Sequence, residues 1–186
     1  DELEKKIMTK IINPTIKGIA EHGNQYKGFL YAGLMIINNE PYLIEYNVRM
    51  GDPECQVILP RLKTDLIKIF KNTIENKLKH TKINWSKNKS MTIVLCAKGY
   101  PGIYKKKLKI NNIHKIRLSK KDFVYHAGTL FLNNTLFSNG GRVLNITSLG
   151  KSFFKIRKKI IANIKKLNWS HGFYRKDIGW KVIEKK

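Results

Sequence analysis

Residues 2–22 carry apolar side chains at the spacing of an amphipathic helix. Pro14 falls inside this segment and predicts an interruption or a kink, because proline has no backbone N–H to donate. Gly23 follows as a natural place for the helix to end. The apolar stripe of this helix consists of Ile7, Met8, Ile11, Ile12, Ile16 and Ile19.

Two extended runs, residues 28–37 and residues 42–49, flank a short polar segment that begins at Asn38. Two such runs around a short polar segment predict a β-hairpin. The first run is almost continuously apolar, so we expect its strand to be buried on both faces.

The second run of this hairpin alternates polar and apolar residues. Because alternate side chains of a strand share a face, Glu45, Asn47 and Arg49 are expected on one side. The opposite side is expected to point into the core through Ile44, Tyr46 and Val48.

A Gly-Asp-Pro-Glu turn at residues 51–54 follows the hairpin. Residues 55–62 are expected to form a helical turn, and Thr64 is expected to cap a further helix. Residues 79–90 are polar and lysine-rich, which indicates a linker or a domain seam. The capped helix is expected to bury one side, formed by Leu66, Ile67, Phe70, Ile74 and Leu78.

Beyond residue 90 the pattern is mainly that of short strands, and the chain contains no internal repeat. A last amphipathic helix is predicted over residues 150–167, and residues 169–180 have the pattern of an aromatic-rich loop. The chain is therefore expected to have an α+β fold. The predicted strands are residues 91–97, 123–126, 129–132, 136–138 and 142–147.

The composition fits a protein with a sizeable core, because 42% of the residues are hydrophobic. No apolar run has the roughly 18–20 residues of a membrane helix, and no leader pattern is recognisable. Cys55 and Cys96 are too few for a disulfide scaffold or a cysteine zinc site. We therefore expect a globular protein with no membrane partner and a cytoplasmic, reducing setting.

The chain has a formal charge of +24, from 37 basic and 13 acidic residues. Residues 1–60 hold eight acidic and six basic residues, so all of the positive excess lies in the later part. Lysine supplies most of it, whereas readers of nucleic acid rely on arginine for bidentate contacts. A solvated lysine-rich surface is the favoured interpretation, and a basic nucleic-acid-binding module remains the alternative.

The polar face of the second strand is the first candidate for chemistry. A carboxylate at Glu45 and an amide oxygen at Asn47 are hard ligands of the kind that Mg²⁺ takes together with phosphate oxygens and water. Arg49, one step further, can hold an anion bound to such a cation. The alternative is an ordinary strand with a solvated polar face.

Two turns offer further candidates. Asp52 and Glu54 can bind a substrate ammonium group or act in proton transfer, although Asp52 can equally cap a helix. Arg142 follows Gly140 and Gly141, which form either a modest anion site or a tight hairpin turn. The histidines have no metal spacing, and His126 is expected to have a structural, hydrogen-bonded role.

Residues 49–56, Arg-Met-Gly-Asp-Pro-Glu-Cys-Gln, resemble a signature of the phosphoribosylamine–glycine ligase family of purine biosynthesis. The family has phenylalanine where this chain has Met50. The resemblance extends in order over nearly the whole length of the chain. It includes residues 13–15, 26–35, 59–63, 98–102, 126–129, 139–144 and 174–179.

This resemblance implies an ATP-grasp ligase whose partners are ATP, glycine and 5-phosphoribosylamine. ATP would phosphorylate the glycine carboxylate, and the amine would then attack the acyl phosphate. Glycinamide ribonucleotide, ADP and phosphate would be the products.

The resemblance also implies roles for single residues. Glu45 and Asn47 would bind Mg²⁺ or Mn²⁺, and Arg49 would stabilise charge during phosphoryl transfer. Three further residues would contact substrates, namely Asp52, Glu54 and Arg142.

By the same resemblance, residues 1–85 would be the C-terminal portion of the ATP-grasp domain and residues 86–186 a small β-rich domain with a terminal helix. The preceding half of the ATP-grasp domain, with a lysine and the adenine pocket, would be missing. We therefore expect the chain alone to be inactive. A non-catalytic fragment remains a further interpretation.

Overall fold

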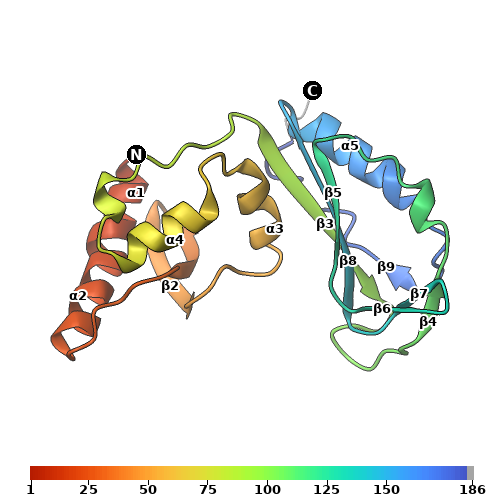
Figure 1. Cartoon of the computed structure of the whole chain (residues 1–186), viewed down its shortest axis with the longest axis horizontal. Coiled ribbons are helices and arrows are strands. Elements are labelled where there is room, and N and C mark those ends of the chain that lie inside the picture. Colours follow the sequence, from red (N-terminus) through yellow and green to blue (C-terminus); the bar gives the residue numbers. More distant parts are fainter. Residues whose placement is uncertain (184–186) are drawn as a thin grey trace. The chain divides into compact units, whose positions relative to one another are not determined.

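The computed structural model describes residues 1–183, which form two compact units (Figure 1). The first unit combines Asp1–Asp52 with Thr64–Ile83, and the second begins with Pro53–Lys63 and continues from Asn84. The expected domain boundary between residues 85 and 86 stays a prediction.

The first unit begins with a nearly continuous helix, as the apolar stripe predicts. It consists of α1 (Glu2–Ile7), a π-helical segment (Met8–Ile12) and α2 (Asn13–Glu21). Pro14 lies in the first turn of α2, directly after the π-helical segment. Since proline cannot donate to the preceding turn, the widened turn accommodates it without ending the helix.

The predicted hairpin is confirmed as β1 (Tyr31–Ile37) and β2 (Glu40–Asn47), which pair antiparallel. Asn38 and Asn39 connect the strands with φ angles of 50° and 61°. Two consecutive residues with positive φ match the twist of a two-residue hairpin turn, and asparagine tolerates this conformation.

The N-terminal helix is tied to the hairpin by polar contacts. The hydroxyls of Thr15 and Tyr46 are 2.6 Å apart. The ammonium groups of Lys6 and Lys10 each lie 2.6 Å from the carboxylate of Glu40. Hydrogen bonds from Lys10 and Lys6 hold the pKa of Glu40 at about 2.

Burial of the first strand on both faces is wrong. Met35 is 53% exposed and Ile37 is 52% exposed. On β2, Ile44 is 66% exposed, and Val48, one residue beyond the end of β2, is 73% exposed, so neither points into a core. The hairpin is a two-stranded sheet, and the helix beside it covers only part of its surface in the described residues.

Helix α4 (Leu66–Ile74) completes the regular part of the first unit. Its cap is Asp65 and not the expected Thr64, because the Asp65 carboxylate accepts from the Lys68 N–H at 2.8 Å. The expected apolar side is only partly correct: Ile67 and Ile74 are each 71% exposed, and the buried residue is Ile69. Phe70, which belongs to the expected side, makes an edge-to-face contact with the ring of Phe29.

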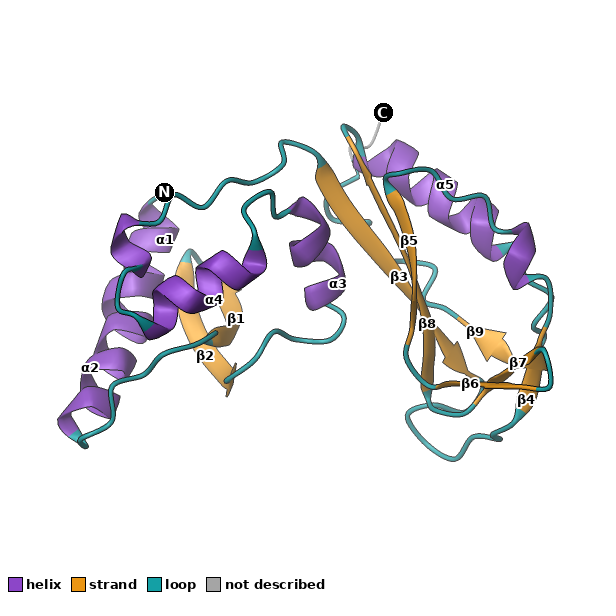
Figure 2. Ribbon diagram, in the orientation of Figure 1, coloured by secondary structure: helices purple, strands orange, loops and turns teal. Residues whose placement is uncertain are grey.

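The second unit begins with the short helix α3 (Cys55–Ile58) and otherwise contains two antiparallel sheets and α5 (Phe153–Ile164), which confirms the expected α+β class (Figure 2). The larger sheet has the order β5-β8-β3-β9, and the smaller has the order β4-β7-β6. The strands are β3 (Lys89–Ala97), β4 (Leu108–Ile110), β5 (Asp122–His126), β6 (Thr129–Leu132), β7 (Thr135–Ser138), β8 (Arg142–Gly150) and β9 (Gly172–Phe173).

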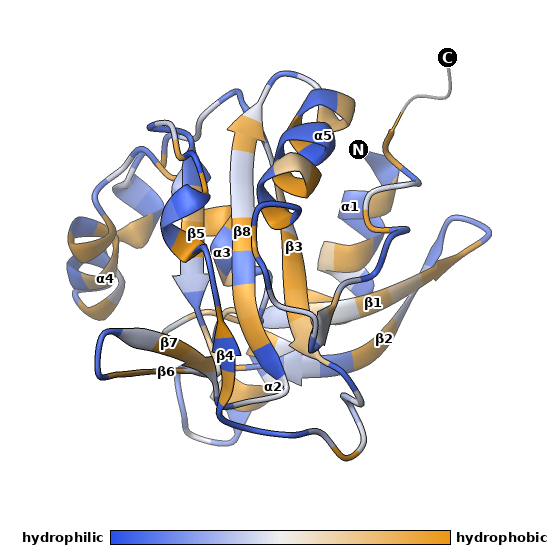
Figure 3. Cartoon of the chain, turned by 90° about the vertical axis from the view of Figure 1, so that its right-hand side faces the viewer, coloured by the Kyte–Doolittle hydropathy of each residue, from blue (hydrophilic) through white to orange (hydrophobic). Residues whose placement is uncertain are grey.

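The core of this unit lies between α5 and one face of the larger sheet. Ile93 on β3, Ile146 on β8 and Ile160 on α5 are each at most 1% exposed. Figure 3 shows strand β3, coloured mostly orange as apolar, and the helix α5 with an apolar and a hydrophilic side. Alternation along β3 and the helical stripe therefore predict this packing correctly.

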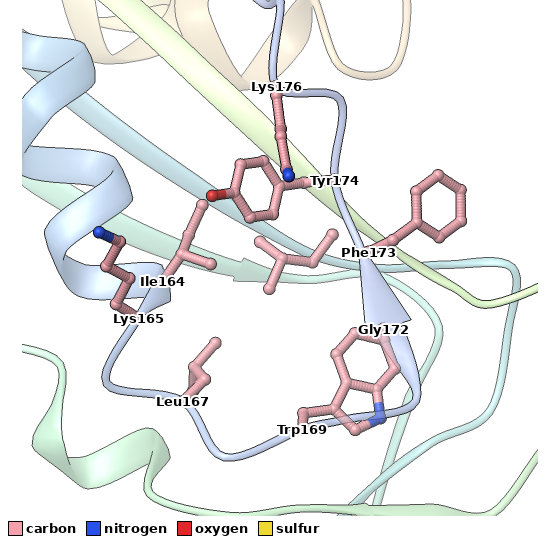
Figure 4. A pocket seen from close by; sticks show the side chains of 9 residues that line it. Ile164, Lys165, Leu167, Trp169, Gly172, Phe173, Tyr174 and Lys176 are labelled. Atoms are coloured by element: carbon pink, nitrogen blue, oxygen red, sulfur yellow. The ribbon is translucent and has the colours of Figure 1, made fainter.

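The aromatic segment after α5 is not a plain loop. Gly172 and Phe173 form β9, which pairs with the end of β3, and Trp169 is buried. A two-residue strand is too short to produce an alternating pattern, so periodicity does not reveal it. Figure 4 shows Trp169 beside Gly172, together with Leu167 and Tyr174, around a cavity of about 330 Å³.

A buried carboxylate fastens α5 to the larger sheet. Asp122 is 5% exposed and accepts hydrogen bonds from the Ser119 N–H at 2.8 Å and from the Ser148 hydroxyl. The ammonium group of Lys159, on α5, lies 2.5 Å from the same carboxylate. Burial opposes ionisation of Asp122, but these hydrogen bonds outweigh it and lower its pKa to about 2.

Candidate functional site

Glu45 and Asn47 lie side by side near the end of β2. They are alternate residues of the strand, so their side chains share a face. The amide nitrogen of Asn47 donates to a carboxylate oxygen of Glu45 at 3.2 Å. The structure therefore brings together the two residues that were expected to bind a metal ion.

The donor set of this pair fits a divalent cation. A carboxylate and an amide oxygen are hard ligands, and Mg²⁺ commonly takes one or two protein ligands with phosphate oxygens and water. The nitrogen and oxygen of an asparagine amide have nearly the same shape, so a half-turn of the Asn47 amide places its oxygen beside Glu45. Within residues 1–183, no three histidine, cysteine or acidic side chains cluster as a metal site.

The neighbouring strand, β1, carries no carboxylate. The residue opposite Glu45 on β1 is Gly33, and a β-bulge follows it between Gly33 and Leu34. A cation at this site would therefore take Glu45 and Asn47 as its ligands from the hairpin.

Arg49 lies two residues beyond the end of β2 and is exposed. Its guanidinium donates to the carbonyl of Met50 at 2.9 Å. Arg49 lies outside the strand, so strand alternation does not fix the direction of its side chain. The prediction of a common face therefore holds for Glu45 and Asn47 and not for Arg49. A strand end is set by pairing with its neighbour, which the run of residues 42–49 does not reveal.

The two acidic residues of the Gly-Asp-Pro-Glu turn fall in different compact units. Asp52 is exposed at the end of a segment of the first unit. Glu54 is half-buried in the second unit, where its carbonyl accepts from the N–H groups of Val57 and Ile58, both at 3.0 Å. The helix α3 begins after Glu54, so the interpretation of Asp52 as its cap is wrong.

Arg142 is the exposed first residue of β8, opposite Cys96 at a β-bulge of β3. Burial raises the pKa of the Cys96 thiol, and the nearby charge of Arg142 partly offsets this effect. The structure thus places Arg142 beside the end of β3.

Gly140 and Gly141, which precede Arg142, lie where neighbouring residues leave no room for a side chain. A Cβ atom on Gly141 would lie 2.1 Å from the ring of Tyr100, and one on Gly128 would lie 2.5 Å from the Cα atom of Gly140. The Gly141 carbonyl also accepts from the N–H of Ala97 at 2.8 Å.

His126 is exposed and makes a hydrogen-bond contact, as expected. Its Nδ1 atom is 3.0 Å from the hydroxyl of Thr129, which begins the next strand.

The second unit contains a cavity of about 420 Å³ that the sequence pattern does not predict. Thr92, Val94 and Cys96 line it because they alternate with the buried core residues of β3. Arg175 also lines it, and its guanidinium donates to Asp177 at 3.1 and 2.6 Å. The remaining lining residues are Pro53, Tyr100, Pro101, Phe173 and Ile178.

None of the helices among residues 1–183 is both long and apolar enough to cross a membrane.

Two family models match the chain. Residues 1–55 match the model described as "Phosphoribosylglycinamide synthetase, ATP-grasp (A) domain", and residues 90–181 match "Phosphoribosylglycinamide synthetase, C domain". Together these ranges include most of the chain.

Curated proteins named phosphoribosylamine–glycine ligase are similar over almost all of this chain. The protein of Agrobacterium fabrum is 44% identical over 179 residues, which are 96% of this chain and 42% of the relative. The chloroplastic protein of Arabidopsis thaliana is 41% identical over 189 residues, which are 100% of this chain and 36% of the relative.

A crystal structure of phosphoribosylamine–glycine ligase from Thermotoga maritima also resembles this chain, with a TM-score of 0.73 and 31% sequence identity. The match covers 93% of this chain and 42% of the other. The chain therefore spans less than half the length of the relatives that it matches.

Proposed function

Because the chain belongs to the phosphoribosylglycinamide synthetase family, in which it matches the C domain and part of the ATP-grasp domain, we propose that it supplies part of the active site of a ligase. This ligase joins glycine to 5-phosphoribosylamine at the expense of ATP. The observation that carries the proposal is the contact of Glu45 with Asn47 at 3.2 Å, inside the segment that matches the ATP-grasp domain.

The proposed reaction has two steps. A carboxylate oxygen of glycine attacks the γ-phosphorus of ATP, and ADP leaves with the bridging oxygen. The amine nitrogen of phosphoribosylamine then attacks the acyl carbon, the bond to the phosphate oxygen breaks, and the nitrogen loses a proton. The products are glycinamide ribonucleotide, ADP and phosphate.

In this proposal Glu45 and Asn47 hold the divalent cation, either Mg²⁺ or Mn²⁺. When bound, the cation neutralises phosphate charge and orients the transferred group. The position of both ligands on a paired strand supports this role, because a site on a rigid element is held more precisely than a site on a loop.

Arg49 is proposed to stabilise the negative charge that develops on the transferred phosphoryl group. Its position two residues beyond β2 supports this role, since an exposed guanidinium outside the strand can turn toward an anion. Substrate contacts are proposed for Asp52 and Glu54, whose carboxylates suit the ammonium group of glycine, and for Arg142, whose guanidinium suits a phosphate.

A cytoplasmic setting is part of the proposal. Its support is the cysteine content, because two cysteines, Cys55 and Cys96, are too few for the disulfide framework typical of a small secreted protein.

A fusion protein tests this function directly. The preceding residues of the Agrobacterium fabrum relative would be joined to this chain, which replaces the matching 42% of that protein. We expect the fusion protein to release ADP only when both glycine and phosphoribosylamine are present, and the Glu45→Ala fusion protein to release at least about 100-fold less. Release of ADP that does not depend on glycine, or an unimpaired Glu45→Ala variant, would refute the proposal.

A further inference from the structure

Strand β1 has no side chain at the position opposite Glu45. Gly33 pairs with Glu45 in the register of the hairpin. A Cβ atom built on Gly33 would lie 3.1 Å from the Cγ atom of Glu45 and 3.6 Å from its carbonyl oxygen. The side chain of Glu45 therefore lies against the backbone of β1, in the space that any other residue at position 33 would fill.

The backbone of Gly33 does not require glycine. Its φ angle lies outside the left-handed region, unlike the φ angle of Gly28 at +149° in the same segment. An L-residue can adopt such a conformation without strain, so the contact with Glu45 is what distinguishes glycine from alanine here. At 3.1 Å this contact is shorter than ordinary van der Waals contact, and one of the two residues has to move.

The displacement would act on the carboxylate of Glu45. That carboxylate accepts from the Asn47 amide at 3.2 Å, so a shift of a few tenths of an ångström at Cγ takes the pair to the limit of a hydrogen bond. Mg²⁺ demands near-ideal octahedral geometry, with ligand distances of about 2.0–2.1 Å. Even a small shift of the Glu45 side chain is therefore enough to weaken a cation site.

We propose that Gly33 is a positioning residue: by leaving room over β1, it lets the Glu45 carboxylate lie beside Asn47, where the two side chains hold one divalent cation. This inference rests on the proposed function, because the cation is the one that Glu45 and Asn47 bind there. Gly33 itself contacts neither cation nor substrate.

The test compares Gly33→Ala with the matched variant Gly18→Ala in the 186-residue chain. Gly18 lies in α2 of the same unit, and a Cβ atom on it would meet nothing within 4 Å. Mn²⁺ is titrated into each ¹⁵N-labelled protein, and broadening of the Asn47 side-chain amide signal reports binding at the site. We expect equal broadening in the wild type and in Gly18→Ala, and about tenfold weaker affinity in Gly33→Ala.

Two outcomes separate this inference from the proposed function. Equal affinity in Gly33→Ala and the wild type overturns the positioning role and leaves the cation site intact. Failure of Mn²⁺ to broaden the Asn47 signal in the wild type overturns the cation site, and with it the inference.

A second measurement does not depend on the cation. Gly33→Ala is also made in a Glu45→Ala background, where the Cγ atom that it would contact is absent, and urea midpoints are compared. We expect Gly33→Ala to lower the midpoint in the wild-type background and not in the Glu45→Ala background. An equal loss in both backgrounds, including complete unfolding in both, shows that Gly33 serves the strand alone and overturns the inference.

Discussion

Replacing Asp122 by asparagine removes the charge that fastens α5 to the larger sheet while keeping the shape of the side chain. Asp122 has an exposed side-chain fraction of 1%, and Lys159 on α5 lies 2.5 Å away. The Ser119 hydroxyl also donates to it at 2.5 Å. Asparagine at this position carries no negative charge for the Lys159 ammonium group and the hydroxyl donors, so the second unit should lose stability.

The size and the pH dependence of this loss follow from the pKa of Asp122. Its folded-state pKa is about 2, below the ordinary value of 3.8. A carboxyl group whose pKa is lowered by folding stabilises the folded state above the unfolded pKa, and this contribution disappears as the pH falls through the folded pKa. The shift corresponds to about 2 kcal/mol at pH 7, and to roughly half of that at pH 3.

Urea unfolding followed by circular dichroism measures this effect. We expect Asp122→Asn to lower the free energy of unfolding by about 2 kcal/mol at pH 7, and by about half as much at pH 3. Asp177→Asn is the matched control, because it breaks the exposed ion pair with Arg175, whose N–O distance is 2.6 Å. An exposed pair of this kind should contribute less than about 1 kcal/mol. An equal loss for Asp122→Asn at both pH values, or a loss no larger than that of the control, would refute this reasoning.

Three further predictions concern packing, activity and charge. Gly141→Ala should lower the free energy of unfolding by about 1–3 kcal/mol, because its Cβ atom would lie 2.1 Å from the Tyr100 ring; a urea midpoint equal to that of the wild type would contradict this contact. The 186-residue chain alone should release no more ADP from ATP, glycine and phosphoribosylamine than a heat-treated sample, because the resemblance assigns the adenine pocket to a preceding part; turnover clearly above that blank would contradict this. Binding of generic RNA, followed by fluorescence anisotropy, should be weak at physiological salt, and tight binding with a steep salt dependence would instead favour the nucleic-acid-binding alternative.

The sequence predicts the elements well where the periodicity is long. The helix near the N-terminus, the hairpin, most strands of the second unit and α5 all follow from patterns over several residues. These patterns arise because one face of each element is apolar. The position of Pro14 predicts a disturbance of the helix, but not that this disturbance is a π-helical segment, because proline can kink, end or widen a helix.

Burial is harder to predict, since periodicity shows which residues share a face but not what covers that face. Ile44 and Val48 alternate as core residues do, and both are exposed because nothing in the described residues covers that part of the hairpin. Asp65 caps α4 in place of the expected Thr64. The two positions differ by one residue, and helix ends are commonly defined only to within one or two residues.

In the candidate site too, contacts within one strand can be predicted from the sequence, and contacts between elements cannot. The contact of Glu45 with Asn47 follows from alternation on one strand, and the structure contains it. The space over Gly33 depends on the register of the hairpin, and the Asp122 cluster joins residues more than 25 positions apart. Contacts of this kind come from tertiary structure, so no local pattern in the sequence predicts them.

Whether Glu45 binds the catalytic cation is tested most directly by replacing both the Glu45 ligand and the metal ion. In the fusion protein described above, Glu45→Cys replaces a hard carboxylate by a thiolate, which prefers softer metals. We predict that this variant loses ADP release with Mg²⁺ and recovers part of it with Cd²⁺, while Glu45→Ala recovers none. A Glu45→Cys variant that works normally with Mg²⁺, or that Cd²⁺ does not restore beyond Glu45→Ala, would contradict the account.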